Sequence, residues 1–438
     1  MVIRSLKSDE TLYSVNAKRL MMPASNMKIV TLAAAADRLG WAYTYETKVF
    51  AIGPVEAGVL AGDLLVVGSG DPSIGEGDRA MPEAFNSCAD ALQARGIRTI
   101  AGRVIGDDNA FDDDGLGFGW SWDDLPDDYA AGVSALQFNE NAVRLTVTPA
   151  MDVGDWAGVS VAPASSGMTI DSALKTGAAD APPSISARRL PGSSHLVLRG
   201  TIPLGSAPLT RLVSVDNPTQ FFVNALRAAL IARGIDVRGP AVDIDDLARA
   251  PALPEAPLLI YKSPPLSTLA MRLMKVSQNL YAETLLKTIG AAAGTPTAIG
   301  GRAAAQAALQ AWGVGPDALI QRDGSGLSRY DYVSPEALVT ILAHVDRDAS
   351  LKAPFEAALP IAGKDGTLSN RMKGTAAEGN ARAKTGSMAN VRGLSGFVAT
   401  AEGEALAFSI LANNFETPPD TITKAADAIV VRLAEFKR

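Results

Sequence analysis

A serine and a lysine three residues apart stand at the start of the most apolar stretch near the N-terminus. Ser25 and Lys28 lie in PASNMKIVTLAAAADRLG, residues 23–40, where a proline precedes, a serine can cap and a glycine can end a helix. Apolar residues surround the axis of this expected helix, so we expect it to be buried. Residues three apart share a helical face, which brings the amine next to the hydroxyl. A buried ammonium is costly unless the lysine has a partner or a task.

This pair alone does not establish chemistry. Ser25 can be an ordinary N-cap and Lys28 can extend to solvent. A second match to the same spacing, Ser172 to Lys175, lies in a stretch with strand and loop character where no buried helix is expected. Corroboration therefore has to come from other parts of the chain.

Two further motifs follow in order. Ser277-Gln278-Asn279 interrupts a pair of helical segments within residues 267–290, where a break can point polar side chains into a cleft. Lys384-Thr385-Gly386 lies on an expected strand before a hairpin turn, with Ser387 next. The order S-x-x-K, S-x-N and K-T-G is the serine acyl-transfer set of penicillin-binding proteins and class A β-lactamases.

The residue types suit such a reaction. A serine hydroxyl is a weak nucleophile that needs an adjacent base, and Lys28 can serve if it is neutral. Burial and a nearby cation such as Lys384 both lower the pKa of a lysine. Ser277 can relay the proton to the leaving amine, and Asn279 can hold the substrate amide and the lysine.

The third motif, Lys384-Thr385-Gly386, and backbone N–H groups can bind the substrate. Lys384 and Thr385 can bind a terminal carboxylate, while Gly386 lets a substrate lie against its strand as an added strand. The backbone N–H groups of Ser25 and Ser387 can stabilise the oxyanion.

Composition narrows the class of protein. The chain has 438 residues, 47% hydrophobic and 20% charged, which indicates a globular protein of two or three domains. The net charge of −7 argues against a nucleic-acid binder. Cys88 is the only cysteine, so neither an intrachain disulfide nor a cysteine metal cluster is expected. We expect no metal and no cofactor. No apolar run is long enough to span a membrane.

The order of expected elements predicts an α/β (α+β) fold. A hairpin over residues 1–20 and three strands near the C-terminus, followed by a helix at about 421–436, can join into one antiparallel sheet. The middle of the chain, roughly 45–258, is then an insertion into one α/β domain.

Across nearly its whole length, the sequence resembles the class C low-molecular-mass penicillin-binding proteins, the D-alanyl-D-alanine carboxypeptidase/endopeptidases. The similar segments are PASNMK, SQNLYAETLL, DGSGLSR, LPIAGKDGTL and KTGSM. The resemblance implies a penicillin-binding/β-lactamase-like transpeptidase domain, an antiparallel sheet flanked by helices, with two inserted mainly-β domains. The implied ranges are 1–44 with 259–438 for the catalytic domain, 45–150 with 211–258 for domain II, and 151–210 for domain III.

The resemblance also implies a pocket for the substrate side chain. In the acidic and aromatic segment GWSWDDL, which contains Trp122, the family's substrate-binding aspartate matches Asp124 most closely, with Asp123 as the rival. Arg329 and Met388 correspond by motif to positions that line the pocket. On the residues alone, Asp123 and Asp124 can equally be solvated loop residues, and Arg329 can pair with a surface carboxylate.

The implied function is a serine-type D-Ala-D-Ala carboxypeptidase, and also a DD-endopeptidase, acting on peptidoglycan stem peptides and acylated by β-lactams. The rivals are a β-lactamase or esterase of the same superfamily and a non-catalytic wall-binding homologue. The family is exported to the periplasm or cell envelope, whereas this chain begins without a signal peptide, which suggests a trimmed or mis-assigned start. A homodimer is compatible with the sequence.

Overall fold

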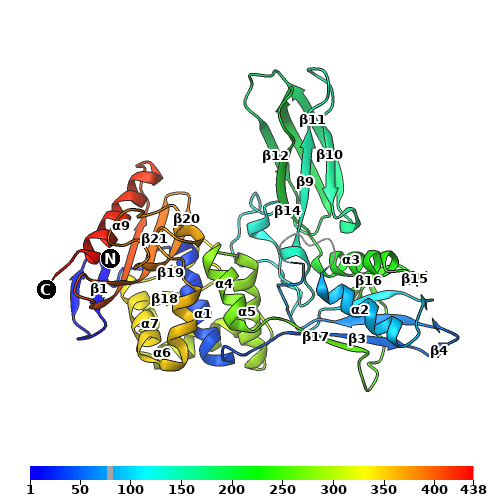
Figure 1. The fold of residues 1–438 in the computed structure, drawn as a ribbon, viewed down its shortest axis with the longest axis horizontal. Coiled ribbons are helices and arrows are strands. Elements are labelled where there is room, and N and C mark those ends of the chain that lie inside the picture. The colour runs from blue at the N-terminus through cyan, green and yellow to red at the C-terminus, as the bar shows by residue number, and fades with distance from the viewer. Residues whose placement is uncertain (76–81, 438) are drawn as a thin grey trace. The chain divides into compact units, whose positions relative to one another are not determined.

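The computed structural model describes residues 1–75 and 82–437, and the chain divides into two compact units (Figure 1). Unit 1 comprises Met1–Thr44, Gly117–Gly119 and Pro264–Arg438; unit 2 comprises Tyr45–Leu116 and Trp120–Ser263. Both units combine helices and sheets, which confirms the predicted α/β class. The finer three-domain division stays a prediction.

Unit 1 is built on a five-stranded antiparallel sheet in the order β2-β1-β22-β21-β20. Its strands are β1 (Val2–Ser5), β2 (Thr11–Ser14), β20 (Arg382–Met388), β21 (Val391–Ala399) and β22 (Ala405–Asn413). The predicted union of the N-terminal hairpin with the C-terminal strands is thus confirmed. Ile3 of β1 lies opposite Phe408 of β22, and both are buried, so apolar pairing sets this register.

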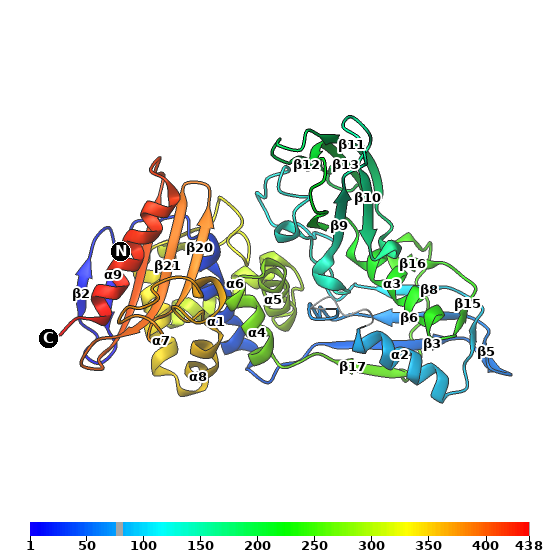
Figure 2. The same cartoon turned by 45° about the horizontal axis from the view of Figure 1, so that its top comes forward.

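Helices cover both faces of this sheet. The helices of unit 1 are α1 (Met27–Leu39), α4 (Leu266–Lys275), α5 (Asn279–Ala292), α6 (Ala298–Ala311), α7 (Pro335–Arg347), α8 (Ala349–Ala358) and α9 (Pro419–Ala434). The unit also contains the 3-10 turns η1 (Ala24–Asn26), η6 (Pro316–Ala318) and η7 (Gly366–Leu368) and the strand pair β18 (Leu319–Ile320) and β19 (Tyr332–Val333). Figure 2 shows α9 on one side of the sheet and α1 and α7 on the other. Helix α1 also packs against α5 and is buried from Met27 to Ala36, as its all-round apolar sequence predicts.

Unit 2 contains the middle of the chain. Its helices are α2 (Glu83–Ala94) and α3 (Pro218–Ala232), and its strands are β3 (Glu46–Ile52), β4 (Val55–Glu56), β5 (Val59–Leu60), β6 (Asp63–Val67), β7 (Thr99–Ile100), β8 (Val104–Asp107), β9 (Ala142–Thr148), β10 (Gly158–Ala162), β11 (Thr169–Gly177), β12 (Ser184–Arg188), β13 (His195–Pro203), β14 (Leu209–Ser214), β15 (Asp236–Val237), β16 (Ala241–Asp243) and β17 (Leu259–Lys262). Short 3-10 turns complete it: η2 (Asp128–Ala130), η3 (Asn139–Asn141), η4 (Ala164–Ser166) and η5 (Ile244–Asp246).

Four sheets organise unit 2. A five-stranded sheet in the order β16-β8-β6-β3-β17 and a four-stranded one in the order β15-β7-β5-β4 accompany α2 and α3, and two three-stranded sheets have the orders β10-β9-β14 and β11-β13-β12. Phe85 of α2 and Phe222 of α3 meet edge to face in its core, with ring centroids 5.2 Å apart. Among the described residues, none of the helices combines the length and the apolar character that crossing a membrane requires.

Candidate active site

Ser25 lies in η1, the turn that leads directly into α1. The expectation that Ser25 caps this helix is wrong: Asn26 holds the N-cap position of α1 and makes no capping bond with its side chain. The reason is the backbone of Ala24, whose φ of 47° is left-handed and turns the chain just before the serine. Gly326 allows this turn, because a Cβ there would lie 1.9 Å from the Ala24 carbonyl oxygen. The Ser25 hydroxyl consequently faces Lys28.

Lys28 is fully buried and donates to three oxygens. Its Nζ lies 3.0 Å from Ser25 Oγ, 2.6 Å from Asn279 Oδ1 and 2.9 Å from the Ser325 carbonyl oxygen. Three acceptors match the three N–H donors of a lysine ammonium group, so Lys28 does not extend to solvent. The geometry holds the amine against the serine hydroxyl.

Burial lowers the pKa of Lys28 from its ordinary value to about 7, although the negative charges of Asp323, Glu283 and Asp331 oppose the shift. At neutral pH a large fraction of this lysine is therefore the free amine. A free amine at hydrogen-bond distance can take the proton of the serine hydroxyl, which is the requirement for a serine nucleophile without a histidine partner.

Ser277 lies in the break between α4 and α5, as the sequence predicts. Its φ of 66° is left-handed, a conformation that a serine adopts only when surrounding contacts hold it there. Lys384 Nζ donates to Ser277 Oγ at 2.8 Å and to the Thr385 carbonyl oxygen at 2.8 Å. The first residue of α5 is Asn279, so this one break supplies side chains to both lysines.

Lys384 is also fully buried. Burial, and then the neighbouring charge of Lys28, lower the pKa of Lys384 well below its ordinary value. The structure thus brings five predicted residues into one cluster in unit 1: Ser25, Lys28, Ser277, Asn279 and Lys384.

The strand that carries the third motif lies at the edge of its sheet. Among the described strands, β20 pairs with β21 alone. The Ala383 N–H points away from β21, because it donates to the Pro360 carbonyl oxygen. Alternate residues of a strand direct their N–H groups the same way, so Thr385 and Ser387 present theirs to the open edge. A peptide substrate can pair there as an added strand.

Asn26 fixes the distance between η1 and this sheet. It is fully buried, and its Nδ2 is close enough to β20 and β21 that a Cβ on Gly386 would lie 2.6 Å from it and one on Gly393 2.3 Å. A Cβ on Gly386 would also lie 2.5 Å from the Pro23 carbonyl oxygen. The two glycines therefore let the turn that carries Ser25 pack directly on the strands.

Sequence reasoning missed a group of buried carboxyl groups beside Lys28. Glu283, Asp323 and Asp331 are all buried, and Asp323 accepts the N–H groups of Gly326 and Ser328 through its two oxygens. Burial raises the pKa of Asp331 well above its ordinary value, with the charge of Asp323 as the next cause. One signal was available in the sequence: Glu283 follows Asn279 by four residues and so shares its helical face.

The residues expected to line the side-chain pocket are divided between the units. Arg329 is exposed and Met388 is half-buried, both in unit 1. Trp122, Asp123 and Asp124 belong to unit 2, where the first two are exposed. Asp124 is half-buried and its Oδ1 accepts a bond of 2.8 Å from the Tyr129 hydroxyl, which distinguishes it from Asp123.

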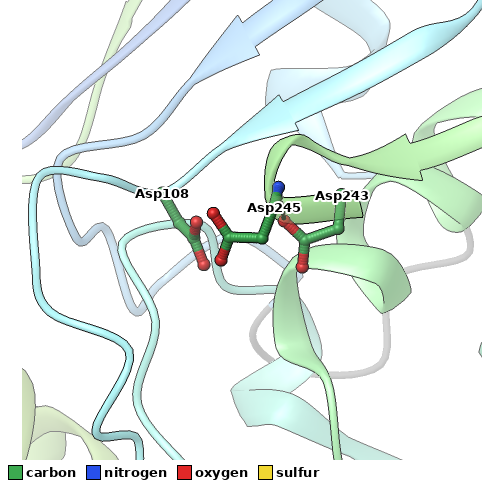
Figure 3. A group of neighbouring side chains, drawn as sticks. All are labelled: Asp108, Asp243 and Asp245. Atoms are coloured by element: carbon green, nitrogen blue, oxygen red, sulfur yellow. Dashed lines mark hydrogen bonds between the residues drawn. The ribbon is translucent and has the colours of Figure 1, made fainter. Parts of the chain in front are cut away.

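A separate acidic group lies in unit 2. Carboxylate oxygens of Asp108, Asp243 and Asp245 come within 4.8 Å of one another. Figure 3 shows the three side chains side by side. Burial raises the pKa of Asp245 to about 6, with the neighbouring carboxylates adding to the shift. Such groups are common without an ion, and Asp243 already accepts a bond from Asn217 Nδ2 at 2.8 Å. The group receives no assignment.

Comparison with known proteins relates the whole chain to one group of enzymes. A family described as D-Ala-D-Ala carboxypeptidase 3 (S13) matches residues 1–436. A D-alanyl-D-alanine carboxypeptidase from Actinomadura sp. is 36% identical over 451 residues, which cover 100% of this chain and 81% of that protein.

Solved structures agree on the fold. Penicillin binding protein 4 (dacB) from Haemophilus influenzae superposes with a TM-score of 0.87 at 24% identity, over 99% of this chain and 96% of that one. The same protein in complex with a novel β-lactam gives a TM-score of 0.80 at 23% identity, over 98% and 95% of the two chains. These matches confirm the predicted penicillin-binding/β-lactamase-like fold.

Proposed function

The chain belongs to the D-Ala-D-Ala carboxypeptidase 3 (S13) family, and we propose that it is a serine-type D-Ala-D-Ala carboxypeptidase whose nucleophile is Ser25. One observation carries the proposal: the buried amine of Lys28 lies 3.0 Å from Ser25 Oγ. Ser25 attacks the carbonyl between two D-alanine residues of a peptidoglycan stem peptide. The terminal D-alanine leaves, and water hydrolyses the acyl-enzyme.

The proton of the Ser25 hydroxyl passes to neutral Lys28. Asn279 supports this role, because its Oδ1 accepts from the Lys28 amine and orients it. Ser277 then relays this proton from Lys28 to the nitrogen of the leaving D-alanine, which returns Lys28 to its neutral form. The contact between Ser277 Oγ and Lys384 Nζ supports this step, since the buried lysine holds the relaying hydroxyl in place.

The substrate binds along the open edge of β20. Lys384 and Thr385 receive the terminal carboxylate, and the Thr385 hydroxyl is oriented by its bond of 2.8 Å to Thr367 Oγ1. The Ser25 and Ser387 N–H groups donate to the oxyanion. In related chemistry such donors lower the activation barrier by several kcal/mol.

The side chain of the substrate meets a separate set of residues. Asp124 binds a free ammonium group on that side chain, with Asp123 as the alternative. Trp122 of unit 2, and Arg329 and Met388 of unit 1, are the further substrate-binding residues of this proposal. The partly buried setting of Asp124 and its bond to Tyr129 favour Asp124 over Asp123.

Further properties come with this chemistry. β-Lactams acylate Ser25, which is supported by the similar protein solved with a β-lactam. Endopeptidase action on D-amino-acid cross-links uses the same residues. The enzyme works in the periplasm or cell envelope, where peptidoglycan is found, and a homodimer is compatible with it.

Labelling with a fluorescent penicillin tests the proposal. Wild type should be labelled and Ser25→Ala should not. Ser172→Ala is the matched control, because Ser172 and Lys175 have the same spacing but lie on β11, and it should label like wild type. Labelling of Ser25→Ala as strong as wild type would refute Ser25 as the nucleophile.

Product analysis separates the enzyme classes. A peptide ending in D-Ala-D-Ala should lose one D-alanine, and the penicilloyl-enzyme should persist. Rapid hydrolysis of penicillin would instead indicate a β-lactamase, and labelling without peptide hydrolysis would indicate a wall-binding homologue.

A further inference from the structure

Glu283 is hydrogen-bonded to the loop that contains Gly324 and Ser325 and faces Lys28. It lies on α5, one helical turn beyond Asn279, with 5% of its surface exposed. Its two carboxyl oxygens accept the N–H groups of two successive loop residues, Gly324 and Ser325, each at 2.8 Å. Two bonds from one carboxylate fix the orientation of both peptide groups.

The carbonyl groups of the same two residues point to α1. The Ser325 carbonyl oxygen accepts from Lys28 Nζ at 2.9 Å, and the Gly324 carbonyl oxygen accepts from Thr31 Oγ1 at 2.7 Å. The loop therefore bridges α5 and α1. Gly324 permits this close approach, because a Cβ there would lie 2.4 Å from the Ala282 carbonyl oxygen.

We infer that Glu283 is a positioning residue of this active site: it holds the Ser325 carbonyl group against Lys28. The inference rests on the proposed function, in which Lys28 is the base. Glu283 acts through the loop and does not touch the substrate.

The charged groups around Glu283 set its protonation. Lys28 faces it from α1, and Asp323 and Asp331 face it from the loop. Lys287 lies one turn further along α5, Arg302 of α6 interacts with Asp331, and Lys384 of β20 interacts with Lys28. Two N–H donors and the ammonium of Lys28 favour the ionised carboxylate, whereas burial and Asp323 oppose it and raise the pKa of Glu283 to about 8. The charge of Glu283 in turn raises the pKa of Lys28 against the effect of burial.

Two variants weaken the hold of Glu283 on the loop in different ways. Glu283→Gln keeps the size but replaces one of the two acceptor oxygens by a donor group, whereas Glu283→Asp keeps the carboxyl group on a shorter side chain. Asp243→Asn is the matched control, since Asp243 in unit 2 is also 5% exposed and accepts two bonds. Acylation by fluorescent penicillin is measured from pH 5 to pH 9 for each protein, together with circular dichroism and thermal unfolding.

We expect Glu283→Gln to acylate roughly tenfold more slowly or worse on the plateau, because one of the two bonds that hold the loop is lost. The acidic limb of its pH–rate profile should move to lower pH by about half a unit or more, because a displaced Ser325 carbonyl group no longer stabilises the ammonium form of Lys28. Glu283→Asp, whose shorter side chain reaches the loop less well, should acylate more slowly and move the limb in the same direction. Asp243→Asn should match wild type in both respects.

Each remaining outcome is decisive. If the acidic limb of the pH–rate profile of Glu283→Gln stays at the wild-type position, Glu283 is a purely structural residue and the inference is overturned. A wild-type acylation rate in this variant overturns it as well. If Glu283→Gln does not fold, Glu283→Asp decides: a lower rate with the acidic limb moved to lower pH supports the inference, and a wild-type rate or an unmoved limb refutes it. If the wild-type protein is neither labelled by penicillin nor able to hydrolyse the peptide, the proposed function and this inference are refuted together. If the wild-type protein is active, the variants test this inference alone.

Discussion

Lys28 Nζ lies 2.6 Å from Asn279 Oδ1, although the two residues are 251 positions apart in the chain. This contact joins the first turn of α1 to the first residue of α5 and holds the amine beside Ser25. All of unit 2 lies between these two residues in sequence. The proposed base is therefore oriented by a contact that only the folded chain can make.

The titration of Lys28 gives the first prediction. Acylation should rise with pH through about 7, because the pKa of Lys28 is lowered to that value and only its neutral form accepts a proton. Lys28→Arg should acylate roughly 10²–10⁴-fold more slowly, because the guanidinium stays protonated. The measurement is the rate of fluorescent-penicillin labelling from pH 5 to pH 9, with Lys175→Arg as the control. A wild-type rate that does not change across pH 7 would contradict it.

Two substitutions at Ser277 distinguish the effect of its backbone conformation on stability from the effect of its hydroxyl on acylation. Ser277→Gly and Ser277→Ala both remove the hydroxyl that meets Lys384, so both should acylate roughly 10²-fold more slowly. Glycine adopts a φ of 66° without strain, so Ser277→Ala should have a free energy of unfolding about 1 kcal/mol below that of Ser277→Gly. Thermal unfolding and labelling measure the two effects. Equal stability of the two variants, or a wild-type rate in either, would count against this account.

Gly386 should tolerate no side chain. A Cβ there would lie 2.5 Å from the Pro23 carbonyl oxygen, so Gly386→Ala should lower the free energy of unfolding by about 2 kcal/mol and slow labelling by displacing η1. Gly315→Ala is the control, because its nearest atom would be 3.9 Å away and its φ of −62° suits alanine. Denaturant titration gives the stabilities. The prediction fails if the two variants are equally stable.

Asp124 should determine preference for the substrate side chain. Asp124→Ala should reduce kcat/KM roughly tenfold for a peptide with a free side-chain ammonium, because a charged hydrogen bond is lost. The same peptide with an acetylated amine should be cleaved as by wild type. Asp123→Ala, which alters the exposed neighbour, is the control. Equal losses on both peptides would show that Asp124 does not recognise the ammonium.

Local pattern explains what the sequence could predict. The apolar run after Ser25 predicts a buried helix, and the spacing of Ser25 and Lys28 brings their side chains together on it, because helical periodicity depends on neighbouring residues alone. The helix break at Ser277 and the strand of Lys384 follow from pattern in the same way. The family resemblance then connects motifs that periodicity leaves separate.

The tertiary structure decided what depends on distant packing. The predicted capping role of Ser25 failed because Gly326, far along the chain, admits the left-handed turn at Ala24. The lowered pKa of Lys28 and of Lys384 arises from complete burial, which several segments produce together. Glu283 went unnoticed because its partners are backbone N–H groups of a loop, and no side-chain pattern encodes them. Residue types and local periodicity determined which groups are available for the chemistry, and long-range packing determined their distances and protonation, because desolvation depends on everything that surrounds a group.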